Sequence, residues 1–289
     1  MRELVRDLIR CPACRAPLGD REAGGLGCAS GHVYPSRNGI PILLADESAA
    51  SDAAAGVDSC EGAFSWATAH WEDLGLGKLL GPAPHAGATL LNFGCASADE
   101  RKLEENVGWQ AVSFDIHATE GTDLVADGHQ LPFADGSFDA VTSFEVLEHL
   151  RAPWIAAEQI ARVLRPGGRF VGSVAFLKPF HDSFFHMTHL GVVALLEPVG
   201  LRVDSVRGGQ SPFVHVIGNF VPVGRALTTR VLNGAHGALA WARRSFWAVK
   251  HRKDPSEPSD RFEPRFQSSF DEFQWLQFGS TVIFSATKT

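Results

Sequence analysis

Hydrophobic positions in the second half of the chain form short apolar runs, and segments with helical spacing or turn residues separate them. Seven of these runs read as strands, at residues 89–93, 111–116, 122–127, 137–144, 165–176, 201–206 and 280–288. The intervening spacing predicts helices at residues 98–107, 154–164 and 189–200, and the fourth strand is expected to enter a further helix that reaches residue 150. This alternation is typical of an α/β protein, and we expect a doubly wound, seven-stranded Rossmann-like sheet.

The rest of the chain divides by composition. Residues 1–46 hold three of the five cysteines and read as a small zinc-ribbon-like module, and residues 47–84 read as an Ala/Ser/Asp-rich linker and a covering helix. The main domain covers residues 85–289, with an insertion at about 208–279. The plainest interpretation of the insertion is a core helix with a loop; a lid, a homodimer face and a membrane-surface patch are alternatives.

The cysteines of the first module have metal-ligand spacing. Cys11 and Cys14 form a C-x-x-C pair, and Cys28 and His32 form a C-x-x-x-H pair. Zinc takes four such ligands at tetrahedral corners, and a closed four-ligand site is structural rather than catalytic. The alternative is that unrelated thiols lie close together, but the paired spacing favours zinc.

Charge and composition limit the partners. The net charge is −7, and residues 1–48 contain six arginines and six acidic residues, so neither favours nucleic acid as a partner. No uncharged apolar run of about 18 residues and no signal-peptide core occurs, and the cysteine number is odd. We therefore expect a cytoplasmic protein with reduced thiols.

Polar residues stand where this type of sheet binds its ligands, beyond the carboxyl ends of the strands. Four positions stand there: the loop that starts at Gly94, the acid Asp115, the acid Asp127, and the segment from Ser143 through Phe144 to Glu145. Asp115 follows Gly94 by 21 residues, a separation at which a carboxylate binds the hydroxyl pair of a ribose.

Two motifs extend this pattern. The stretch "LPFADGSFDAVTSFEVLEHLRAP" followed by "RVLRPGG" resembles the class I S-adenosylmethionine-dependent methyltransferases, in the methyltransferase-11-like branch, over roughly residues 88–206. The resemblance implies that Gly94 marks the cofactor loop and that Asp115, with Ile116, holds the ribose. It also implies that Asp127 and Gly128 lie against the adenine, and that Ser143, Phe144 and Glu145 line the methionine end. With its Cys3His module the chain is also similar to the large-subunit ribosomal RNA guanine methyltransferases, although its charge argues against their substrate.

The first loop departs from the family pattern of acid-x-G-C-G-x-G. Asn92 replaces the acid, and Ala96 and Ala98 replace two glycines. One unfavourable φ costs about 1–2 kcal/mol, so we expect cofactor affinity to fall about tenfold without being lost. These replacements also support an alternative, a catalytically altered protein of the same fold that serves as a binding or scaffold subunit.

Histidines supply the candidate catalytic groups. His149 follows the fourth strand and could act as a base, although a packing role is an equal alternative. His181 and His186, with Asp182 and His189, follow the fifth strand, where they could act as acid or base, bind an anionic substrate, or bind a second metal. The leading hypothesis is a zinc-containing methyltransferase for a small molecule; an RNA methyltransferase is the least favoured alternative.

Overall fold

The computed structural model describes residues 1–21, 24–45, 76–94, 104–119, 121–178, 183–209, 238 and 280–289. The expected linker, the first part of the covering helix and nearly all of the 208–279 insertion therefore lie outside the described residues. The described end of the covering helix is α4 (Leu76–Leu80). Among the described residues, no helix combines the length and apolar character that crossing a membrane requires.

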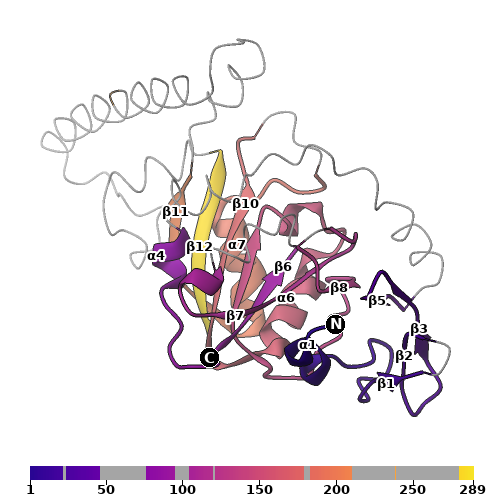
Figure 1. The fold of residues 1–289 in the computed structure, drawn as a ribbon. Helices are drawn as coiled ribbons and strands as arrows, with labels where there is room; N and C mark the ends of the chain where they lie inside the picture. Colours follow the sequence, from indigo (N-terminus) through magenta and orange to yellow (C-terminus); the bar gives the residue numbers. More distant parts are fainter. Residues whose placement is uncertain are drawn as a thin grey trace, which may run out of the picture.

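The predicted seven-stranded sheet is present (Figure 1). It contains β6 (Thr89–Phe93), β7 (Gln110–Asp115), β8 (Leu124–Ala126), β9 (Phe138–Phe144), β10 (Leu164–Ala175), β11 (Leu201–Gly208) and β12 (Thr281–Lys288). Their order is β11-β12-β10-β9-β6-β7-β8, and β12 is antiparallel to both of its neighbours. The order reverses beside β6, so the carboxyl ends of β6, β7 and β9 form the switch point at which such sheets bind ligands.

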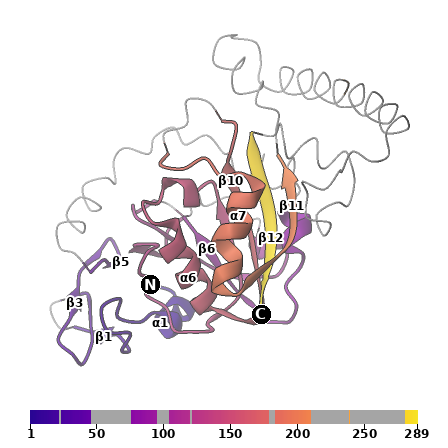
Figure 2. The ribbon, with the colours of Figure 1, turned by 180° about the vertical axis from the view of Figure 1, so that it is seen from behind.

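Helices cover the sheet on both faces. On one face α6 (Pro153–Val163) and α7 (His189–Leu196) bury their apolar sides against the strands (Figure 2), and α4 packs on the other. Thr188 caps α7 by accepting a hydrogen bond from the Gly191 N–H, and Gly200 ends this region in the left-handed conformation after η3 (Glu197–Val199). The helix expected after β9 is only a 3-10 turn, η2 (Leu147–His149).

A row of phenylalanines forms the centre of the main core. Phe93 contacts Phe114 edge-on, Phe114 contacts Phe133, and Phe133 contacts Phe138, with centroid separations of 4.9, 6.4 and 5.0 Å. All four side chains are buried. Phe133 lies in the loop between β8 and β9, so this loop is fixed to the core rather than free at the surface.

The N-terminal segment is built into the main sheet. It comprises α1 (Glu3–Leu8), β1 (Gly19–Asp20), β2 (Leu26–Gly27), β3 (Val33–Tyr34), β4 (Ser36–Arg37) and β5 (Ile40–Leu43). β5 pairs in parallel with β8, and β4 pairs with β5, which extends the sheet to nine strands. The apolar run of β5 thus protects an edge that β8 would otherwise expose, a pairing that the sequence pattern did not predict.

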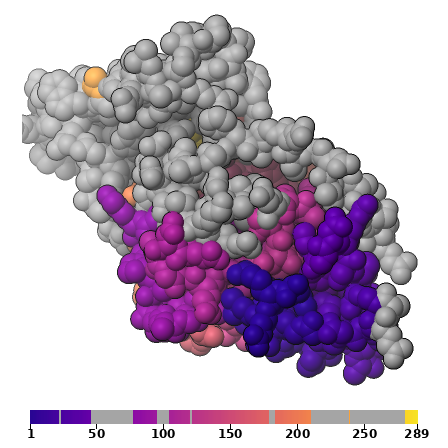
Figure 3. All heavy atoms as spheres, in the orientation of Figure 1, coloured from indigo at the N-terminus to yellow at the C-terminus, as the bar shows by residue number. Residues whose placement is uncertain are grey.

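Contacts away from the sheet also join the two parts of the chain. Arg2 forms an ion pair with Asp123, and Ile9 forms an antiparallel bridge with Phe133. The buried side chains of Val5, Ile9 and Tyr34 belong to the same hydrophobic cluster as the phenylalanines. Figure 3 shows the N-terminal residues lying directly against the main domain. The division into separate domains stays a prediction, but the described residues share one core.

Candidate functional site

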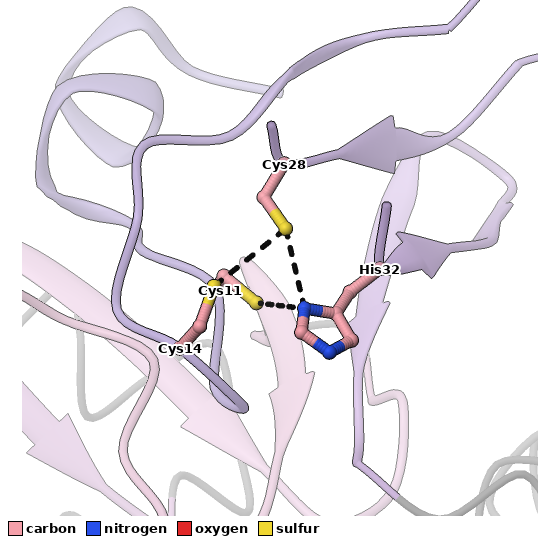
Figure 4. Close-up of side chains that lie close together, drawn as sticks. All are labelled: Cys11, Cys14, Cys28 and His32. Atoms are coloured by element: carbon pink, nitrogen blue, oxygen red, sulfur yellow. Dashed lines mark hydrogen bonds between the residues drawn. The ribbon is translucent and has the colours of Figure 1, made fainter. Parts of the chain in front are cut away.

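The four predicted metal ligands come together. The ligand atoms of Cys11, Cys14, Cys28 and His32 all lie within 4.8 Å of one another (Figure 4). The His32 Nδ1 is 3.5 Å from the Cys11 Sγ and 3.3 Å from the Cys28 Sγ, and the Cys14 and Cys28 Sγ atoms are 3.6 Å apart. A zinc ion about 2.3 Å from sulfur and about 2.0 Å from nitrogen places its ligands at similar separations. The group therefore fits one tetrahedral ion.

The surroundings shift the pKa values of Cys14 and Cys11 in opposite directions. The Ala16 N–H and the Ser30 hydroxyl lower the pKa of Cys14 to about 7, which favours the thiolate that binds metal. Burial raises the pKa of Cys11, whose Sγ lies 3.2 Å from the Tyr34 hydroxyl. In the ionised form that sulfur would accept a hydrogen bond from Tyr34, a contact that orients a metal ligand.

Gly94 starts the loop after β6 with a φ of +80°. A Cβ built on it would lie 2.5 Å from a methyl carbon of Val146, so both its conformation and its surroundings require glycine. Ala96 and Ala98 lie outside the described residues. The structure therefore places the beginning of the loop at the switch point and leaves the two alanines as a sequence observation.

Asn92 is the penultimate residue of β6, two positions before Gly94. It is 1% exposed, and its Nδ2 has no hydrogen-bond partner among the described residues. Its strand neighbours on either side are Ser113 and Thr142. An unpaired buried donor costs free energy, so Asn92 fits a place where a ligand or a water completes the hydrogen bonds.

Asp115 ends β7 beside that loop. Burial raises the pKa of its carboxyl, and the His117 N–H, 3.0 Å from Oδ1, partly opposes this effect. A second acceptor position on this carboxylate would suit a ribose hydroxyl. The side chain of the adjacent Ile116 is 42% exposed, which leaves an apolar surface next to the acid.

Asp127 follows β8, and a histidine fixes its position. Its Oδ1 accepts hydrogen bonds from the His129 backbone N–H at 2.9 Å and from His129 Nδ1 at 2.7 Å. The opposite ring nitrogen, Nε2, accepts from the Ala152 N–H at 3.2 Å, just before α6. This pattern places the proton of a neutral His129 on Nδ1. Between these residues, Gly128 allows close packing, since a Cβ there would lie 2.4 Å from the Phe93 ring.

The carboxyl end of β9 holds the three residues predicted for the methionine end. The Ser143 hydroxyl is buried without a hydrogen-bond partner among the described residues, and Phe144 is half-buried. Glu145 has a φ of +56°, costly for a residue with a side chain, and its N–H donates to the Ser173 carbonyl at 2.9 Å. Its carboxylate forms an ion pair with Lys178, and both side chains are about nine-tenths buried.

The structure describes three of the four candidate histidines, His149, His186 and His189. His149 ends η2 and is exposed, and His186 is exposed in the segment before α7. His181 and Asp182 lie outside the described residues, so the proposed histidine cluster stays a prediction. His189 is the first residue of α7, and burial lowers its pKa.

Two residues of this site did not emerge from the sequence. Lys178 lies three residues after the apolar strand β10. Its charge was the only feature of the sequence that could have indicated a role in the site. His129 lies two residues before the family-like motif, and its position two residues after Asp127 permits the observed contact. Glu148 of that segment has a structural role, since its Oε1 accepts from the Ala175 N–H at 2.8 Å.

The comparisons with known proteins agree with this fold. Residues 91–172 match a family model described as a methyltransferase domain. A protein of Mycobacterium sp. strain JLS described as an uncharacterized methyltransferase is 37% identical over 114 residues, which cover 36% of this chain and 45% of the relative. An uncharacterized 37.1 kDa protein in transposon TN4556 of Streptomyces fradiae is 31% identical over 194 residues, covering 59% and 51%. The chain thus spans about half the length of these relatives.

A solved structure also resembles the chain at low identity. The 1,6-didemethyltoxoflavin-N1-methyltransferase of Burkholderia thailandensis is 13% identical, with a TM-score of 0.48, and the match covers 83% of this chain and 86% of that one. No substrate follows from a likeness at this level. Over residues 91–172, the chain is therefore similar to a methyltransferase domain.

Proposed function

We propose that this chain is an S-adenosylmethionine-dependent methyltransferase for a small-molecule acceptor, and that Cys11, Cys14, Cys28 and His32 hold a structural zinc ion. One observation carries the cofactor part: Asp115 ends β7 beside the Gly94 loop, at the switch point of the sheet, and Asp127 follows the neighbouring strand β8. When bound, the cofactor supplies an electrophilic methyl group on a sulfonium.

The residues present suit the cofactor in three ways. Asp115 offers a partly buried carboxylate for the two ribose hydroxyls, and burial strengthens a hydrogen bond to it. Asp127, held by His129, offers an acceptor at the adenine end. The buried Asn92 amide and Ser143 hydroxyl have hydrogen-bonding capacity that the described residues do not use.

The acceptor side is assigned from position and charge. In the sequence, His149 follows β9, and His181 and His186 follow β10, so each is a candidate base that could remove a proton from the acceptor. The net charge of −7 favours a small molecule over nucleic acid. A homodimer or a membrane-surface contact through the 208–279 insertion remains a sequence-based hypothesis, as does the cytoplasmic location.

Titration with S-adenosylhomocysteine tests the cofactor site. We expect saturable binding by isothermal calorimetry, and a loss of about tenfold or more in Asp115→Asn, because a hydrogen bond to a charged group is replaced. Asp204→Asn is the matched control, since Asp204 lies on the edge strand β11 and pairs with Arg202. No binding at millimolar ligand would overturn the proposal.

Labelled methyl transfer separates the enzyme from its alternatives. The protein is incubated with methyl-labelled cofactor and, in separate reactions, with a small-molecule extract, bulk RNA and protein. Label in the small-molecule fraction supports the proposal, and label in RNA supports the ribosomal-RNA alternative. Cofactor binding without transfer in any fraction supports the scaffold alternative.

A further inference from the structure

We infer that the Cys11–Cys14 metal knuckle positions the adenine end of the cofactor site, with Gln130 as the coupling residue between the metal and Asp127. The inference rests on the proposed function and adds to it a link between two sites. The knuckle is defined here as residues 11–14, and the β8–β9 loop as residues 127–137.

The N-terminal segment holds the β8–β9 loop from the side of the sheet. β5 pairs with β8 through Ile42 opposite Val125 and Leu43 opposite Ala126. Asp127 is the next residue after Ala126, so its backbone begins where this pairing ends. A shift of β5 would therefore move the start of the loop.

The knuckle and the two residues before it hold the middle of the same loop. The Arg10 N–H donates to the Pro132 carbonyl at 2.7 Å, and the adjacent Ile9 bridges to Phe133. Gln130 donates through Nε2 to the Pro12 carbonyl at 2.9 Å. Pro12 lies between the metal ligands Cys11 and Cys14, so this carbonyl belongs to the turn that the metal would fix.

Gln130 also connects directly to the predicted adenine acid. Its backbone N–H donates to the Asp127 carbonyl at 2.9 Å and closes a turn. Within that turn His129 binds the Asp127 carboxylate. The path from the metal ligands to the carboxylate thus consists of the knuckle carbonyl, Gln130 and one short turn.

Metal binding would order this path. Without a cation, the knuckle loses the metal–ligand bonds that would hold its backbone. The β8–β9 loop then loses a fixed partner for Gln130 and samples positions in which Asp127 is misplaced. Coupling between two binding sites is reciprocal. If the metal raises the affinity of the chain for the cofactor, the cofactor must raise the affinity of the chain for the metal by the same factor.

The test uses the full chain, loaded with zinc, and the variant Gln130→Ala. Gln110→Ala is the matched control, because Gln110 is exposed at the opposite, amino end of β7. Calorimetry measures the dissociation constants of S-adenosylhomocysteine and of 5′-methylthioadenosine, which lacks the amino-acid end. We expect both ligands to bind Gln130→Ala about three- to tenfold more weakly, the range expected for one lost hydrogen bond, and Gln110→Ala to match the unaltered chain.

Zinc transfer to a chromogenic chelator gives a second readout without any activity. Saturating S-adenosylhomocysteine should slow this transfer about three- to tenfold in the unaltered chain and less in Gln130→Ala. The inference would be overturned if Gln130→Ala bound both ligands as tightly as the unaltered chain does, and if saturating S-adenosylhomocysteine left the zinc transfer rate of the unaltered chain unchanged. Weakened binding of S-adenosylhomocysteine alone would do so as well, since it would place the effect at the methionine end. Failure of the unaltered, zinc-loaded chain to bind S-adenosylhomocysteine would instead reject the proposed function, and this inference with it.

Discussion

Lys178 and Glu145 form a nearly buried ion pair that joins the carboxyl ends of β10 and β9. Glu145 is also one of three described residues other than glycine with positive φ, so two unfavourable features meet at one position beside the cofactor site. Such features persist where the surrounding structure fixes them and are common at functional sites. We interpret the pair as the device that holds the Glu145 turn.

Removing the lysine should therefore destabilise the protein. In Lys178→Met the Glu145 carboxylate loses its ion pair with the lysine, and we expect the free energy of unfolding to fall by about 3 kcal/mol. Urea denaturation measures this loss. The double variant Lys178→Met/Glu145→Gln should recover part of it, because the uncompensated charge is gone; additive losses would contradict the assignment.

The pH dependence of cofactor binding should follow Asp115. Because burial raises its pKa, the carboxylate takes up a proton at a higher pH than an ordinary aspartate, whose pKa is about 3.9. Ribose hydroxyls donate to the ionised form, so affinity for S-adenosylhomocysteine should be constant near neutral pH and fall as the pH decreases through the raised pKa. Calorimetry across this range should show that decrease in the unaltered chain and a flatter profile in Asp115→Asn.

The same shift has an opposite effect on the cofactor-free protein. A raised carboxyl pKa means that the folded chain binds this proton more tightly than the unfolded chain, so the contribution to stability is lost as the pH rises through the folded pKa. Asp115→Asn should therefore stabilise the cofactor-free chain at neutral pH while weakening ligand binding. Thermal unfolding at pH 7 checks this expectation, and a destabilised variant would contradict it.

Gly94 and Gly87 form a matched pair for testing the cofactor loop. Both have a φ of +80°, but a Cβ at Gly87 would meet no atom within 4 Å, whereas one at Gly94 would overlap Val146. We expect Gly87→Ala to cost about 1 kcal/mol of stability and Gly94→Ala about 2–4 kcal/mol. In urea titrations Gly94→Ala/Val146→Ala should be less destabilised than the sum of its single variants; full additivity would exclude the steric explanation.

The zinc proposal predicts a stoichiometry. Elemental analysis should find one zinc per chain, and chelation or Cys28→Ser should remove it and lower the melting temperature by about 10 °C, since the metal binds only the folded state. Cys60→Ser is the control, because Cys60 belongs to neither the C-x-x-C nor the C-x-x-x-H pair of the sequence. Full zinc content in Cys28→Ser would contradict the assignment of ligands.

Much of the fold follows from local pattern. The apolar runs placed all seven strands of the main sheet within a few residues, because buried parallel strands flanked by turns have few alternative structures. The helix predicted at residues 189–200 is present as α7, which ends at Leu196 and is followed by the 3-10 turn η3 and Gly200. The paired cysteine spacing correctly grouped four ligands, since a C-x-x-C turn brings its two sulfurs together locally.

Long-range pairings required the tertiary structure. No local pattern shows that β5 joins β8, because an apolar run does not specify which strand it pairs with. The same limit applies to the contacts of Lys178 with Glu145 and of Gln130 with Pro12, which join residues 33 and 118 positions apart.

The sequence by itself determined the alternating fold, the acids at the strand ends and the four grouped Cys and His residues, because each depends on spacing along the chain. Only the tertiary structure decided that the metal knuckle, β5 and the β8–β9 loop belong to one core. The physical reason is that distant segments are brought together by the total burial and hydrogen bonding of the folded chain, which neither segment encodes alone.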